Sequence, residues 1–89
     1  MARIEIAITE GGAPGEANAS EDALFQLGMM YSTGASVPAD YVAAHKWFNL
    51  AALKGRKDAI AHRQEVARQM SDAEIAAAQR EARAWVTTH

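Results

Sequence analysis

The chain has 89 residues, a length that fits one domain with a modest core. Apolar residues make up 49% of it but aromatic residues only 7%, so alanine supplies much of the apolar content, which favours closely packed helices over a bulky β core. The absence of cysteine excludes disulfides, cysteine-ligated zinc and thiol nucleophiles, and a net charge of −2 is too small to indicate nucleic acid as a partner.

The charges are unevenly placed along the chain. Residues 1–40 hold one base and six acids, whereas residues 41–89 hold eight bases and five acids. Such a dipolar chain could steer a charged partner or pair its ends across a dimer, although two differently solvated faces explain it more simply. No stretch has the length of a signal peptide's apolar core or of a membrane span, so we expect a cytoplasmic protein without a membrane partner.

Residues 1–19 are predicted to be an N-terminal arm and linker. Residues 3–9 alternate polar side chains with Ile4, Ile6 and Ile8, a period typical of a β-strand, whereas a short helix fits the isoleucines less well. Since no second strand is predicted, the arm either pairs with another chain, lies extended against the helices, or is disordered. Glycines and a proline at residues 11–15 interrupt the chain before a short linker.

Two helices are predicted over residues 20–55. Ser20 is a good N-cap, with acidic residues in the first turn of a helix over residues 21–31. Residues 32–39 contain Gly34 and Pro38 and cannot continue this helix. Asp40 caps a second helix over residues 41–54, and Gly55 ends it.

Two further helices are predicted over residues 56–89. Apolar residues at helical spacing, from Ala59 through Val66 to Met70, indicate a helix over residues 57–70. Ser71 and Glu74 have the spacing of a capping box that opens a last helix over residues 72–86. The expected fold is therefore all-α, with four helices arranged as two helical hairpins in series.

Small and large side chains recur at fixed intervals through the first hairpin, at Ala23, Leu27, Gly28, Tyr31, Gly34, Val37, Asp40, Ala44, Trp47, Ala51, Ala52 and Gly55. This pattern resembles the Sel-one-like repeat, a relative of the tetratricopeptide repeat, and departs from it at Ser36, where the family usually has glycine. The resemblance implies an α/α solenoid in which residues 20–55 are a full repeat and residues 56–89 a degenerate or capping hairpin.

The resemblance also implies a protein or peptide partner, bound in a groove lined by the first helix of each pair. Removing the packing positions leaves as candidates Asp22, Phe25, Gln26, Met29, Ser32 and Thr33 on one helix and His62, Glu65, Arg68 and Gln69 on the other. Phe25 and Met29 either anchor a peptide or bury against the arm. An interaction adaptor is thus the expected function. The alternative is self-association as a homodimer, through the open solenoid end or the N-terminal strand.

No catalytic, cofactor or metal site is predicted. The three histidines are separated by 17 and 27 residues and form no ligand pair. The serines lack the context of a catalytic nucleophile, and the basic run at Lys54, Arg56 and Lys57 is interrupted by Asp58. Trp85, near the end of the last helix, is expected to seal the apolar edge of the solenoid in preference to anchoring a partner.

Overall fold

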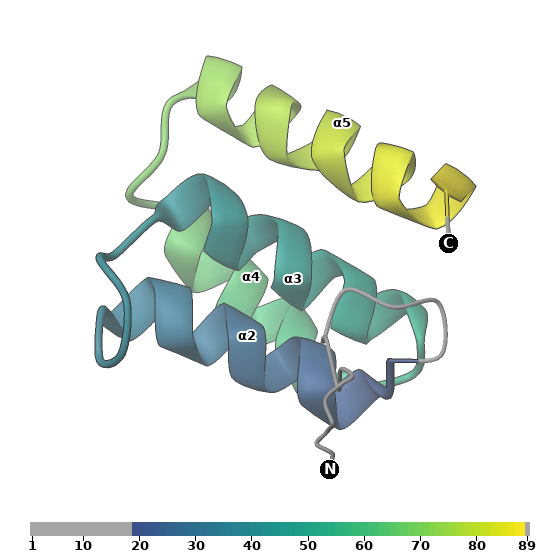
Figure 1. The fold of residues 1–89 in the computed structure, drawn as a ribbon. Helices are drawn as coiled ribbons and strands as arrows, with labels where there is room; N and C mark the ends of the chain where they lie inside the picture. The colour runs from purple at the N-terminus through teal and green to yellow at the C-terminus, as the bar shows by residue number, and fades with distance from the viewer. Residues whose placement is uncertain (1–18, 89) are drawn as a thin grey trace, which may run out of the picture.

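The computed structural model describes residues 19–88, which form four α-helices (Figure 1): α2 (Glu21–Thr33), α3 (Tyr41–Leu53), α4 (Asp58–Ala67) and α5 (Asp72–Thr88). None of these residues is in a strand, which confirms the predicted all-α class. The strand predicted for residues 3–9 lies outside the described residues and stays a prediction. None of the helices within residues 19–88 combines the length and apolar composition needed to cross a membrane.

The helices begin at the residues that the capping signals indicated. Ser20 accepts a hydrogen bond through its side chain from the backbone N–H of Ala23, and Asp40 does the same for Ala43, each at 3.1 Å. At the start of α5 the capping box is complete. The Ser71 hydroxyl accepts from the Glu74 N–H at 3.1 Å, while the Glu74 carboxylate accepts from the Ser71 N–H at 2.8 Å.

Two glycines with positive φ end the first two helices. Gly34 has φ of +71° and donates its N–H to the carbonyl of Met30 at 2.9 Å. Gly55 has φ of +113°, and its N–H bonds to Ala52 while the next N–H bonds to Ala51, both at 3.0 Å. This pair of hydrogen bonds is the Schellman motif, in which a residue with positive φ reverses the chain.

Helix α4 is shorter than predicted. It ends at Ala67 instead of Met70 because the next N–H groups bond to carbonyls three residues back: Gln69 to Val66 at 2.9 Å and Met70 to Ala67 at 3.0 Å. These tighter turns close off α4 so that Ser71 can begin α5. Helix α2 extends two residues beyond the predicted end, to Thr33.

Helix α3 is the centre of the fold. It is the helix against which α2, α4 and α5 all pack, and Figure 1 shows it between α2 and α5 with α4 behind. The core follows from this arrangement, since Ala44, Phe48, Leu50 and Ala51 of α3 are all at most 1% exposed. The structure thus departs from the predicted second hairpin: a short turn joins α4 to α5, but each packs mainly on α3 instead of on the other.

Small side chains make the close approach of α2 and α3 possible. Gly28 of α2 faces the ring of Phe48, and a Cβ placed at this glycine would lie 2.5 Å from the ring atoms Cδ1 and Cε1. On the other side of α3, α5 packs through its small residues Ala78 and Ala82, which are both buried. Two large apolar side chains, Ile60 of α4 and Val86 of α5, are exposed.

Candidate functional site

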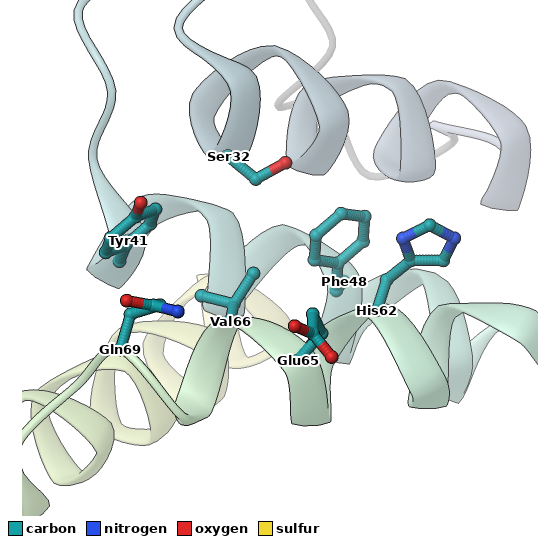
Figure 2. Close-up of a pocket in the computed structure, with 7 residues that line it drawn as sticks. All are labelled: Ser32, Tyr41, Phe48, His62, Glu65, Val66 and Gln69. Carbon is teal, nitrogen blue, oxygen red and sulfur yellow. The ribbon is translucent and has the colours of Figure 1, made fainter.

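Helices α2 and α4 flank the same face of α3 and leave a shallow groove between them (Figure 2). The groove has a volume of about 230 Å³. One residue from the last turn of α2, two from α3 and four from α4 and the turn after it line this groove: Ser32, Tyr41, Phe48, His62, Glu65, Val66 and Gln69. Its surface therefore combines an aromatic floor with polar walls.

The floor is held by an aromatic cluster. Phe48 is fully buried, and its ring centroid lies 5.5 Å from that of Phe25 and 5.3 Å from that of His62, which stacks on it with an angle of 29° between the planes. His62 also meets Phe25 edge-on, with centroids 5.0 Å apart. These contacts fix the imidazole of His62 at the groove while leaving it partly exposed.

Arg56 connects the beginning of α2 to the beginning of α4. Its guanidinium lies 2.9 Å from a carboxylate oxygen of Asp22 and 2.9 Å from one of Asp58, and it sits 3.7 Å above the centre of the Phe25 ring. The hydrogen bond from Arg56 holds the pKa of the Asp58 carboxyl below its ordinary value. The two carboxylates thus hold the Arg56 guanidinium over the Phe25 ring, at one end of the aromatic cluster.

Four of the ten predicted groove residues line the observed groove: Ser32, His62, Glu65 and Gln69. The other members lie elsewhere. Asp22 is engaged with Arg56, Arg68 forms an ion pair with Glu65 at 2.6 Å, and Met29 is partly buried against the core. Gln26 and Thr33 are exposed, and the Thr33 hydroxyl donates to the carbonyl of Met29 at 2.8 Å.

The sequence left open whether Phe25 anchors a peptide or buries against the N-terminal arm, and the structure buries its ring among side chains of the helices. Phe25 is only 7% exposed because Phe48, His62 and Arg56 cover its ring, so it supports the groove from below. The sequence alone did not decide whether Phe25 is buried, because the repeat pattern specifies no residue type at this position. Its burial depends on side chains that come from α3, α4 and the turn between them.

Sequence reasoning missed three lining residues, Tyr41, Phe48 and Val66. A signal was available for the first two, since Tyr41 and Phe48 are seven residues apart and therefore share one face of α3. No residue of α3 was among the candidates, because the resemblance implies a groove lined by the first helix of each pair, α2 and α4. In the structure, α3 lies beneath the groove and supplies its floor through Tyr41 and Phe48.

His45 is a second histidine with an unusual environment. It is only 4% exposed, and its Nδ1 atom has no hydrogen-bond partner among residues 19–88. Burial, followed by the nearby positive charge of Arg63, lowers the pKa of His45 below 6.5. Both effects favour the neutral form of the imidazole. Among residues 19–88, no three His, Cys, Asp or Glu side chains come together in a group that could hold a metal ion.

The two tryptophans join α3 to α5. Trp47 and Trp85 meet edge-on, with ring centroids 6.1 Å apart and 81° between the planes. Trp85 is partly buried against the core, as expected for a residue that seals the apolar edge. Nearby, the Lys46 ammonium lies 4.2 Å from the Trp47 ring centre and 3.9 Å from Glu81 of α5.

Comparison with known proteins identifies one part of the chain. Residues 21–55, which span α2, α3 and the turns that flank them, match the family model described as Sel1 repeat. No curated protein and no solved structure matches the chain.

Proposed function

Because residues 21–55 of this chain are a Sel1 repeat, a family whose members are generally protein–protein interaction modules, we propose that the groove between α2 and α4 binds a segment of a partner protein. The carrying observation is that four groove residues expected from the repeat register meet in one depression over Phe48 (Figure 2). Two of them, Glu65 and Gln69, are exposed and offer polar atoms to a peptide backbone or side chain.

The groove suits a short extended segment better than a whole domain surface. Tyr41 and His62 present ring faces or edges on which an apolar side chain of the partner can pack, while Ser32, Glu65 and Gln69 surround them with hydrogen-bonding groups. The aromatic cluster beneath is already packed, so the floor needs no ordering when a partner binds.

A pair of glutamines allows a matched test. Gln69→Lys places a long cation at the groove, from the turn that follows α4. Gln64→Lys makes the same change at an exposed position within α4 that does not line the groove. Partners captured by the full chain from an extract are identified by mass spectrometry, and their binding to each variant is then measured. We expect Gln69→Lys, and Glu65→Lys with it, to weaken binding at least about tenfold, equivalent to about 1.4 kcal/mol.

Circular dichroism must show the same helix content for all three variants, because neither glutamine is buried. Equal binding by Gln69→Lys and Gln64→Lys would contradict the groove as the binding surface. Self-association, the alternative from the sequence, stays a prediction, and light scattering at tens of micromolar chain tests it separately.

A further inference from the structure

A second, apolar cleft lies on the other side of α3, where the last turns of α3 and α5 approach. Six residues line this cleft of about 280 Å³: Asn49, Leu53, Ala82, Arg83, Val86 and Thr87. Leu53 is 69% exposed and Val86 53% exposed, which makes them the two most exposed large apolar side chains among residues 19–88. Two aliphatic side chains facing one cleft from different helices form a surface that water solvates poorly.

The beginning of the described chain lies at the same end of the fold as this cleft. Asp22, in the first turn of α2, pairs at 2.9 Å with Arg56, which follows Leu53 by three residues. Figure 1 shows the first turn of α2 at the same end of the molecule as the last turns of α3 and α5. Residues 1–18 are therefore attached at the end of the fold where this cleft lies.

The composition of residues 1–18 complements the cleft. The segment carries three alternating isoleucines, Ile4, Ile6 and Ile8, and its side chains include three acids against one base. The cleft lining includes one base, Arg83, and no acid, and Arg83 makes no ion pair with residues 19–88. The nine residues 10–18 span up to about 30 Å when extended, enough to bring the isoleucines back to the adjoining surface.

We infer that residues 4–8 of the same chain occupy the cleft between α3 and α5, with isoleucine side chains on Leu53 and Val86 and acidic side chains in the field of Arg83. Apolar contact supplies most of the attraction, since each isoleucine leaves water for an aliphatic surface. The occupied cleft is distinct from the α2–α4 groove. The segment thereby covers the exposed apolar end of the repeat and leaves the proposed partner site open.

The absence of native cysteine allows a direct test in the full chain. Ala7→Cys supplies a single attachment point for a nitroxide spin label, and amide signals of the ¹⁵N-labelled protein are compared before and after reduction of the nitroxide. We expect the amide signals of Leu53 and Val86 to lose most of their intensity in the oxidised sample. The signals of Ser36, in the loop between α2 and α3, and of Gln64 should keep theirs.

Two variants of the spin-labelled chain complete the experiment. Ile4→Ser with Ile6→Ser and Ile8→Ser should restore the Leu53 and Val86 signals, whereas the matched triple Ala2→Ser, Ala13→Ser and Ala17→Ser should not. Undiminished Leu53 and Val86 signals in the original labelled chain would overturn the inference. A second result would also overturn it. If ¹⁵N-labelled chains without a nitroxide are mixed with ¹⁴N chains that carry one, and the Leu53 and Val86 signals broaden, the cleft is occupied by a second copy of the chain.

Discussion

Replacing Gly28 by alanine should destabilise the fold, although alanine is the better helix former. In an exposed helix interior this change would stabilise the protein by about 1 kcal/mol through backbone propensity. At Gly28 the added Cβ would lie 2.5 Å from two ring carbons of Phe48, well inside van der Waals contact. The ring cannot move freely because Phe25 and His62 hold it at centroid distances of 5.5 and 5.3 Å.

The two effects can be compared in magnitude. Overpacking a well-filled core costs about 1–3 kcal/mol, and an overlap against a fully buried ring that contacts two other aromatic rings belongs at the upper end of that range. Subtracting the propensity gain of about 1 kcal/mol leaves a net loss of about 1–2 kcal/mol. For a domain of this size, the melting temperature should then fall by roughly 5–15 °C.

Urea unfolding followed by circular dichroism and tryptophan fluorescence measures this loss. Gln26→Ala, at an exposed position of the same helix, serves as the control and should change the free energy of unfolding by less than about 0.5 kcal/mol. Phe48→Leu should relieve the overlap, so the double variant with Gly28→Ala should be more stable than the sum of the single effects predicts. A Gly28→Ala protein as stable as the parent would refute the close approach of α2 and α3.

Two further predictions concern single residues. Ser71→Ala removes the hydroxyl that accepts from the Glu74 N–H, and we expect urea unfolding to show a loss of about 1 kcal/mol that Thr at this position largely avoids. His45 has a lowered pKa in the folded state because of burial and Arg63, so the unfolded chain binds more protons as the pH falls through 6.5. The free energy of unfolding should therefore decrease below that pH and level off under the folded-state pKa. His45→Gln, which cannot titrate, should lack this decrease, and an identical pH profile for both proteins would contradict the assignment.

The features that could be predicted from sequence are those decided within a few residues. Ser20, Asp40 and the Ser71–Glu74 box cap helices through hydrogen bonds to N–H groups three positions away, so their spacing alone identifies them. Gly55 reverses the chain by a backbone conformation that needs no side-chain partner. For residues 19–88, the fold class, the number of helices and most of their bounds follow from such local rules.

The features that sequence reasoning missed depend on which helices meet. Phe25 was free in the repeat pattern, and only the meeting of α2 with Phe48, His62 and Arg56 buries it. Similarly, the apolar stripe of α5 suits packing against either α3 or α4. Alanines at 78 and 82 fit any close helix neighbour, so the choice of α3 is made by long side chains such as the Trp47–Trp85 pair.

The architecture around α3 separates what keeps the groove in shape from what a partner would touch. Phe48 and Phe25 are buried, and Arg56 holds Asp22 and Asp58 together across the start of two helices, so substitutions at these positions act first on stability. Glu65 and Gln69 are exposed and contribute little to the core, so they can change without loss of the fold. Because folding has already fixed the floor, binding affinity in the proposed function is set by the exchangeable wall residues, and closely related repeats can differ in partner while sharing one packed centre.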